Sequence, residues 1–400
     1  MQINSGLPED FNPSAYDMIV VGAGYAGAVC ARRLAETVGF RVAVLERRNH
    51  IAGNAYDYLD EAGVLVHMYG PHIYHTFSER VHTFLSRFTE WTDYQHKVLA
   101  NVHGTLMPVP FNHKSLLLAF GEERGEELYA KLVETFGKDV KVPILQLREK
   151  NDPDLAEIAD YVYENVFLHY TMKQWGQTPD EIDPSVTARV PIFVGDDDRY
   201  FPQAPYQGMP AEGYTALFEN MLDHDCIDVF CDVDARDIFE LTDTTVKVCG
   251  NVYGGEVIYT GPLDELFDLD LGALPYRTLD MKFETLDMGQ FQPVGTVNYT
   301  VSEDFTRITE FKNMTGQEVP GKTTIMKEYS HAYEPGSGQT PYYAILDPDN
   351  RKLYESYLER VSHITNFHPV GRLAEYRYYD MDAVTASALN LSDEIIACHA

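Results

Sequence analysis

The chain has 400 residues, of which 44% are hydrophobic and 12% aromatic, and this composition indicates a folded protein of two or three domains. Its 62 acidic and 31 basic residues give a formal net charge of −31 at pH 7, which argues against nucleic acid and against an anionic membrane surface as partners. No apolar run reaches the roughly 20 residues that a membrane span requires, so we expect none.

The N-terminal segment and the cysteines indicate the compartment. The first residues, MQINSGLPEDFNPSAYD, have no basic region followed by an apolar stretch, so we expect no secretory signal. The five cysteines are widely spread and form no C-x-x-C pair, and ordinary thiols in a reducing cytoplasm are the simplest interpretation.

The first predicted elements form a nucleotide-binding unit. Residues 18–21 predict a buried strand, Gly22 to Gly27 spell G-x-G-x-x-G, and residues 28–38 predict a helix. Residues 41–45 predict a second strand that ends in Glu46. The glycine motif alone would be a weak signal, but strand, helix, second strand and terminal acidic residue in this order are specific for a dinucleotide-binding fold.

Each position of the motif has a physical reason. Gly22 permits a tight turn, Gly24 lets the backbone approach a pyrophosphate, and Gly27 allows the helix to pack closely on the strand. The start of the helix offers its positive end to the phosphates, and Glu46 can accept hydrogen bonds from the adenosine ribose.

The residues after Glu46 favour FAD over NAD, which is the alternative. They read RRNHIAGNAYDY, and the basic pair followed by a Gly-Asn turn resembles FAD-binding proteins of the glutathione-reductase type. From the glycine motif, Glu46 and the residues that follow it, we expect the cofactor to contact Gly22, Gly24, Tyr25, Ala26, Gly27, Glu46, Arg47 and Asn54.

The remaining elements follow in chain order. We expect a hairpin turning at 61–63, a helix from the T-x-x-E capping box at 76–79 to about Trp91, and short strands within 96–111. Helices should follow over 112–176, with a start signal at 151–153, and then a long loop to about 210. The rest of the chain predicts mixed elements over 214–265, an antiparallel sheet over 275–328, and a C-terminal loop and helix.

Together these elements predict an α/β fold in which a Rossmann-like FAD-binding domain is interrupted by a helical domain and an antiparallel β-sheet domain. The expected spans are 1–78, 204–266 and 345–400 for the FAD-binding domain, 112–203 for the helical domain, and 79–111 and 267–344 for the sheet domain.

The stretch GPHIYHT at 70–76 places His72 and His75 just after the hairpin. As metal ligands they would need further cysteine, histidine or carboxylate partners at suitable spacing, and none is evident, so we expect no metal site. They remain either buried structural residues or the lining of a functional site.

Four motifs carry a family resemblance. GPHIYHT, NYTVSEDFTRITEFK, KEYS…PYYAI and GRLAEYRYYDMD, with the nucleotide motif before them, resemble the UDP-galactopyranose mutase family in its own order, over residues from about 15 to about 395. The segment EYSHAYEPGSGQTPYYAI is longer than the family's link between its Glu-Tyr and Tyr-Tyr elements, which leaves the choice between Tyr342 and Tyr343 less secure.

The resemblance implies an isomerase that interconverts UDP-galactopyranose and UDP-galactofuranose with FAD, active in the reduced form. It places His72 and His75 beside the isoalloxazine ring as catalytic residues, with Gly70 and Pro71 fixing the backbone there. It further implies cofactor contacts from Gly371, Arg372, Asp380 and Met381.

For the substrate the resemblance implies that Arg189 and Arg307 bind the diphosphate and serve catalysis, since a guanidinium matches phosphate oxygens in bidentate fashion. Two arginines gathered in this way would offset the acidic chain. Tyr170 and Trp175 would belong to a mobile lid. The other substrate-binding residues it implies are His96, Tyr200, Asn298, Tyr343 and Tyr378.

The implied mechanism has no net redox change. The N5 atom of the reduced flavin attacks the anomeric carbon and displaces UDP, the sugar ring opens and recloses at the other size, and UDP returns. The resemblance also implies a homodimer or larger homo-oligomer. Two alternatives are an amine-oxidase-type flavin oxidoreductase, which would reduce its flavin with substrate and release hydrogen peroxide, and a nucleotide-sugar-binding protein without activity.

Overall fold

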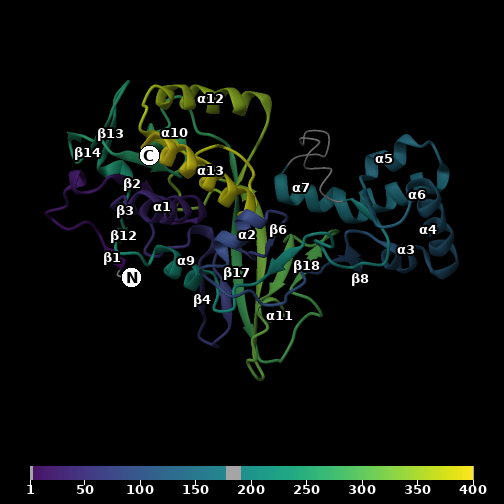
Figure 1. Ribbon diagram of the computed structural model, residues 1–400. Helices are drawn as coiled ribbons and strands as arrows, with labels where there is room; N and C mark the ends of the chain where they lie inside the picture. Colours follow the sequence, from purple (N-terminus) through teal and green to yellow (C-terminus); the bar gives the residue numbers. More distant parts are fainter. Residues whose placement is uncertain (1–2, 177–190, 400) are drawn as a thin grey trace.

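The computed structural model describes residues 3–176 and 191–399, which form three regions side by side (Figure 1). A nucleotide-binding region contains both α1 (Tyr25–Val38) and α13 (Met381–His399). A long-stranded sheet lies in the middle, and a group of helices lies on the far side of it. The domain boundaries expected from the sequence stay a prediction.

The nucleotide-binding region is built on a six-stranded parallel sheet. Its strands are, in spatial order, β1 (Ile3–Ser5), β12 (Ile227–Cys231), β3 (Val42–Leu45), β2 (Met18–Val21), β16 (Glu256–Tyr259) and β22 (Phe367–Pro369). Both faces are covered, as an all-parallel sheet requires.

The alternation along β2 shows how the two faces are packed. Met18 and Val20 point into a core shared with α1, α13 and α9 (Tyr214–Leu222). Ile19 points into a second core, shared with α10 (Leu263–Leu266) and α12 (Pro348–Ser362). The predicted strand, helix and second strand of the nucleotide motif are therefore confirmed, and the helix begins three residues earlier than expected, at Tyr25.

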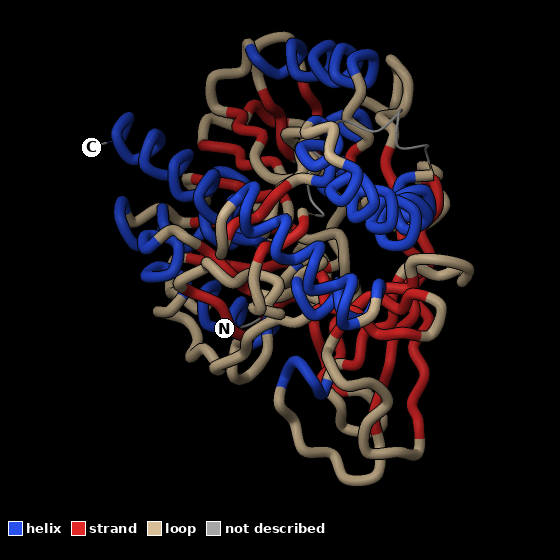
Figure 2. Tube along the Cα trace, turned by 90° about the vertical axis from the view of Figure 1, so that its right-hand side faces the viewer, coloured by secondary structure: helices blue, strands red, loops and turns tan. Residues whose placement is uncertain are grey.

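The central sheet has seven strands. They are, in spatial order, β21 (Tyr343–Ala344), β17 (Tyr276–Leu286), β20 (Thr323–Ala332), β19 (Arg307–Glu310), β18 (Thr296–Tyr299), β7 (Val98–Val102) and β8 (Thr105–Val109). Figure 2 shows the long strands running out to one end of the molecule. The sheet is not wholly antiparallel as predicted, because β7 joins β18 in parallel.

The helical region comprises α3 (His113–Phe120), α4 (Glu122–Phe136), α5 (Ile144–Glu149), α6 (Pro153–Val162) and α7 (His169–Trp175). Asp152 caps α6, its side chain accepting from the N–H groups of residues 154 and 155, with Pro153 in the first turn. The predicted helix start at this point is confirmed. A π-helical stretch, Tyr163–Leu168, joins α6 to α7.

Small two- and three-stranded sheets complete the fold. They pair β4 (Asp57–Leu59) with β5 (Leu65–His67), β6 (Tyr74–Thr76) with β11 (Tyr206–Gly208), β9 (Val140–Val142) with β10 (Ile192–Val194), and β13 (Phe239–Leu241) with β14 (Val246–Val248) and β15 (Asn251–Val252). A short helix, α11 (Lys312–Thr315), follows β19.

The predicted capping box is wrong in detail. Ser78 is the N-cap of α2 (Glu79–Leu85), with its hydroxyl accepting from the Val81 N–H. Thr76 instead lies at the end of β6 and donates to Asp382 at the start of α13. The helix also ends at Leu85 rather than near Trp91, because the chain there turns to pair Trp91 with Pro210.

Among the described residues no helix is both long and apolar enough to cross a bilayer.

Candidate active site

A cavity of about 840 Å³ lies where the three regions meet. Gly22 and Glu46 line it from the nucleotide-binding region, Arg307 from the central sheet and Tyr170 from the helical region. This volume is near the upper end for small-molecule sites, so the cavity suits a long cofactor with a substrate beside it.

The glycine motif forms the turn between β2 and α1 at one end of the cavity. Gly22 has φ 101°, and a Cβ there would collide with the Thr260 side chain. Gly24 is the N-cap of α1 without a capping side chain, which leaves the first N–H groups of the helix available to an anion. Gly27 lies behind the wall and does not line the cavity: a Cβ there would collide with the Gly22 carbonyl oxygen. Its contribution is close packing of helix on strand.

Glu46 is buried at the end of β3, with 6% of its surface exposed. One carboxylate oxygen accepts from the Ala23 N–H at 2.9 Å and the other accepts from the Arg48 N–H at 2.9 Å. Each oxygen has a second lone pair, so the carboxylate can also accept from a ribose hydroxyl.

Two more predicted cofactor residues lie beside Glu46 on the cavity wall. Arg47 donates to the Glu265 carboxylate at 3.0 Å, and Asn54 accepts from the Arg48 guanidinium at 2.9 Å. Glu265 comes from α10 and was not foreseen, because nothing in its local sequence distinguishes it from a surface carboxylate.

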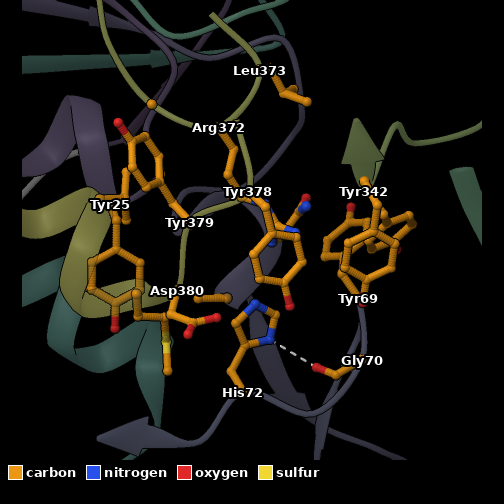
Figure 3. A pocket seen from close by; sticks show the side chains of 18 of the residues that line it. Tyr25, Tyr69, Gly70, His72, Tyr342, Arg372, Leu373, Tyr378, Tyr379 and Asp380 are labelled. Carbon is orange, nitrogen blue, oxygen red and sulfur yellow. Dashed lines mark hydrogen bonds between the residues drawn. The ribbon is translucent and has the colours of Figure 1, made fainter. Parts of the chain in front are cut away.

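The loop before α13 brings a cation to the middle of the cavity. Gly371 has φ 102°, and a Cβ there would lie 3.0 Å from the Ala26 Cβ. Arg372 follows, with its guanidinium carbon 4.9 Å from the Tyr378 ring centroid (Figure 3). Its Nη2 atom is buried and has no hydrogen-bond partner in the part of the chain that the structure describes. A buried guanidinium with an open N–H group suits an anion.

These features fit FAD. A glycine turn and helix N-terminus for phosphates, a buried carboxylate for ribose and a guanidinium with a buried, open N–H group for the pyrophosphate all line the same cavity. Tyr25, Ala26, Asp380 and Met381 complete this wall.

The turn Gly70-Pro71-His72 forms the next part of the wall. Gly70 has φ 93°, and the Gly70 carbonyl oxygen lies 2.9 Å from the His72 Nδ1 atom (Figure 3). A carbonyl can only accept, so Nδ1 carries the proton and Nε2 is the acceptor. Burial, with His67 nearby, lowers the pKa of His72 to about 4, so the ring is neutral at pH 7.

His75 and His96 approach the cavity from β6 and from the segment before β7. The His75 ring stacks on Phe201 with centroids 3.6 Å apart, and His96 packs near the same phenyl ring. His96 is 4% exposed, and its Nδ1 atom lies 2.9 Å from the Tyr94 hydroxyl. Burial lowers the pKa of His96 to about 3, so it too is neutral.

Arg307 lines the end of the cavity opposite the glycine turn. Its Nη2 atom donates to the Tyr170 hydroxyl at 2.6 Å, and its Nε atom lies 3.3 Å from a Glu328 carboxylate oxygen. Burial disfavours the charge of Arg307, but Glu328 and the neighbouring tyrosines hold its pKa well above the ordinary value. Burial raises the pKa of Glu328, whose other carboxylate oxygen has no hydrogen-bond partner among the described residues.

The remaining predicted substrate residues surround this guanidinium. Asn298 pairs with Arg307 in the β18–β19 register, and its side-chain oxygen is buried without a hydrogen-bond partner in residues 3–176 and 191–399. Tyr343 and Tyr378 stack with centroids 5.8 Å apart. Burial raises the pKa of Tyr200 to about 12, so its hydroxyl stays protonated and can donate.

The structure therefore brings most of the predicted residues to one cavity. Arg189 lies outside the described residues, and so does the side chain of Trp175. Glu328 is a lining residue that was missed: strand alternation indicates the face on which it lies but not that its neighbour is Arg307. Tyr342 and Tyr343 both line the cavity, and Tyr343 as the substrate-binding residue stays a prediction. The roles assigned to these residues stay predictions.

Comparison with known proteins gives the family. The sequence profile described as UDP-galactopyranose mutase matches residues 165–378, and that of a Rossmann-like NAD(P)-binding domain matches residues 20–88. The chain is 32% identical to a UDP-galactopyranose mutase of Mycoplasma pneumoniae, over 98% of each chain. It is also 32% identical to a dTDP-fucopyranose mutase of Escherichia coli, over 93% of this chain and 96% of that one.

The fold agrees with this assignment. A solved structure of a reduced UDP-galactopyranose mutase superimposes with a TM-score of 0.70 at 16% identity, covering 96% of this chain and 94% of that one. Both the full-length sequence similarity and the profile match lead to one conclusion: this chain is a member of the UDP-galactopyranose mutase family of enzymes.

Proposed function

We propose that the protein interconverts UDP-galactopyranose and UDP-galactofuranose with bound FAD and without net redox change. The observation that carries the proposal is a single cavity with the dinucleotide-binding turn at one end and Arg307, Tyr170 and the buried Glu328 at the other. In a chain of this family, the first end suits the cofactor and the second suits the nucleotide-sugar diphosphate.

FAD would be held by the glycine turn, Glu46 and Arg372, with its ring system toward the Gly70–His72 turn. When bound and reduced, the flavin supplies a nucleophilic nitrogen for the anomeric carbon of the sugar. Burial keeps the His72 ring neutral, and its Nε2 atom can accept a hydrogen bond there.

Arg307 would bind the diphosphate, and Arg189 would provide a second guanidinium. The Tyr170 hydroxyl and the Glu328 carboxylate orient the Arg307 fork, which reduces the entropy lost when a phosphate binds. Tyr200, Tyr343 and Tyr378 would donate to phosphate or sugar oxygens, because burial keeps Tyr200 and Tyr343 protonated. Asn298 and His96 would accept from sugar hydroxyls, and Trp175 would cover the uridine.

A second substrate has specific support. The dTDP-fucopyranose mutase of Escherichia coli is as similar to this chain as the Mycoplasma enzyme, so the sugar and the base could both differ from UDP-galactose. The reaction type would be the same, and only the groups that contact uracil, the ribose 2′-hydroxyl and the sugar C6 would change.

The test is a chromatographic assay of the purified protein with UDP-galactofuranose or dTDP-fucofuranose, each with and without dithionite. We expect conversion of UDP-galactofuranose only in the reduced samples. Preferential conversion of dTDP-fucofuranose would identify the dTDP sugar as the substrate in place of the UDP sugar. Binding without conversion of either sugar, or flavin reduction by substrate with release of hydrogen peroxide, would overturn the proposed reaction.

Cytoplasmic location and a homodimer or larger assembly belong to the same proposal, and gel filtration with light scattering tests the latter.

A further inference from the structure

His67 is a buried histidine next to the cavity but outside its lining. It ends β5, has 0% of its surface exposed, and packs with its ring against Tyr214 and Phe311 at centroid distances of 5.5 and 5.6 Å. An apolar side chain would fill this space at lower cost, because a buried polar group without full hydrogen bonding is destabilising. The presence of an imidazole at this buried position therefore indicates a specific role for its polar atoms.

The reason is a single hydrogen bond. The backbone N–H of His72 donates to the His67 Nδ1 atom at 3.0 Å. Nδ1 must then be unprotonated, so the neutral ring carries its proton on Nε2, which is buried and has no partner among the described residues. His67 thus accepts a main-chain N–H of the cavity wall and leaves its own N–H unsatisfied.

The neutral state of His67 is secured by burial. Burial lowers the pKa of His67 to about 3, and no carboxylate of the described chain lies close enough to oppose it. A protonated ring would place an N–H group against the His72 N–H group and break the hydrogen bond. The acceptor is therefore available at pH 7.

The turn that His67 holds has few other restraints. Pro71 has no N–H group to donate. Gly70 has φ 93°, and a glycine is free to adopt other φ values as well. Among the described residues, the Gly70 carbonyl and the His72 ring form hydrogen bonds only with each other. The hydrogen bond from His72 to His67 links this turn to the hairpin β4–β5, where His67 pairs with Asp57 and Asp57 in turn accepts from the first N–H groups of α9.

We propose that His67 is a positioning residue, which fixes the Gly70–His72 turn through the His72 amide and thereby sets where the His72 ring stands in the cavity. This proposal rests on the proposed function only in taking the ligand at this turn to be the flavin. His67 itself touches neither flavin nor substrate.

Three substitutions separate this role from simple space filling. His67→Asn keeps an acceptor where Nδ1 stood, because the asparagine Oδ1 atom is attached to Cγ, as Nδ1 is in histidine. His67→Gln is equally polar but carries its amide farther out, near the position of Nε2, and His67→Leu has no acceptor. Asn and Gln form the matched pair.

The first measurement is hydrogen exchange at the His72 amide, read residue by residue in the purified holoprotein. We expect wild type and His67→Asn to exchange alike, and His67→Gln and His67→Leu to exchange about tenfold faster or more, since an N–H without its acceptor opens readily. The second is the FAD dissociation constant in the same samples, expected within about twofold of wild type for Asn and about tenfold higher for Gln and Leu.

Equal exchange in all four proteins, or an Asn variant as fast as the Leu variant, would reduce His67 to a core residue and overturn the proposal. So would faster exchange with unchanged FAD affinity. If His67→Leu does not fold, the Asn and Gln pair decides alone. Neither readout uses a nucleotide sugar, so absence of isomerase activity in the wild type would overturn the proposed function and leave this test intact.

Discussion

Arg307 on β19 and Tyr170 on α7 meet across the cavity, with the guanidinium Nη2 donating to the phenol oxygen at 2.6 Å. The bond joins the central sheet to the helical region at the point where the two form one wall. It also orients the partly buried guanidinium, whose Nε atom lies 3.3 Å from a Glu328 carboxylate oxygen.

The first prediction concerns this cation. Arg307→Ala should weaken UDP binding by about 10- to 150-fold, the usual effect of removing one charge-assisted hydrogen bond from a buried site, and leave FAD occupancy normal. Isothermal titration with UDP and the flavin absorbance of the same sample measure the two effects. Tyr170→Phe should weaken UDP binding less, because the charge remains.

The control must account for Glu328, which is 1% exposed and would lose the cation beside it. A buried unpaired carboxylate destabilises a fold by several kcal/mol, about 3–5 when one partner of a buried pair is removed. The double variant Arg307→Ala/Glu328→Gln should therefore regain thermal stability without regaining UDP affinity. Arg360→Ala, which removes an exposed arginine bound to Asp270, should change neither. Wild-type UDP affinity in Arg307→Ala would remove this arginine from the site.

The second prediction concerns the cofactor. The purified protein should be yellow, with FAD bound without a covalent link, and Gly24→Leu should be colourless but folded, because a side chain at the helix N-terminus occupies the space of the phosphates. The flavin released by heat identifies the cofactor, and the ratio of visible to ultraviolet absorbance gives the occupancy. Gly289→Leu, in the exposed segment after β17 where a Cβ meets nothing within 4 Å and φ is not positive, is the matched control. FMN in place of FAD would contradict the assignment of the glycine turn.

What the sequence could predict here was local in the chain. The turn from β2 into α1 is contiguous, and each glycine in it answers to a constraint set by near neighbours, so the motif showed the fold of that region. Strand alternation likewise indicated a sheet after residue 275. It could not give the parallel pairing of β7 with β18, since the face on which a residue lies does not reveal the neighbouring strand.

In the candidate site, too, the sequence revealed residues that belong to local motifs and missed those without one. His72, Arg307 and Tyr378 were found from motif positions, whereas Glu328 and His67 were missed. Glu328 is recognised only through its pairing with Arg307 on the neighbouring strand, and His67 only through the fold of the turn that brings the His72 amide to its ring. A carboxylate on a strand and a histidine in a hairpin have no sequence signal of their own.

The third prediction concerns pH and uses His96. Its pKa falls from an ordinary value near 6.5 to about 3 on folding, so below pH 6.5 the unfolded chain binds a proton that the folded protein does not. Stability is therefore lost as the pH falls toward the folded pKa. Between pH 7 and pH 5 this one group should remove about 2 kcal/mol from the free energy of unfolding.

His96→Asn removes that group, so the variant should lose about 2 kcal/mol less than wild type over the same interval, measured by urea unfolding at both pH values. Asp264 acts in the opposite sense in both proteins, because burial raises its pKa to about 6 and the folded state then binds the extra proton. Its effect cancels when the two proteins are compared. Parallel pH profiles for the two proteins would show that His96 is solvated.

The fourth prediction concerns Trp175. The other tryptophan, Trp91, stacks on Tyr74 with centroids 3.9 Å apart and donates to Ser86 at 2.9 Å, away from the cavity lining. Its fluorescence should not respond to ligands. Saturating UDP should therefore change the emission of wild type and of Trp91→Phe alike, if Trp175 covers the uridine as proposed. An unchanged spectrum in Trp91→Phe would count against that role.

The last prediction concerns the nucleophile. Among the described residues that line the cavity there is no cysteine and no serine, and burial raises the pKa of Cys30 and of Cys231 to about 12, which leaves these thiols protonated. The two lining threonines, Thr260 and Thr296, have no adjacent base in the described chain: the Thr260 hydroxyl donates to the Val21 carbonyl, and that of Thr296 is buried without a partner there. This favours the cofactor, as proposed, as the source of the attacking electron pair.

Activity should therefore appear only when the flavin is reduced, because reduction turns N5 into an electron-rich amine. Protein reconstituted with a reduced flavin analogue that has carbon in place of N5 should bind UDP-galactose with near-normal affinity and give no isomerisation, whereas reconstitution with FAD restores turnover. The analogue changes one atom and leaves the contacts of Glu46, Arg372 and the Gly70–His72 turn available to it. Turnover at the normal rate with the analogue would rule out N5 and direct attention to a side chain, for which the protonated Tyr343 and the His72 Nε2 atom are the nearest candidates on the cavity wall.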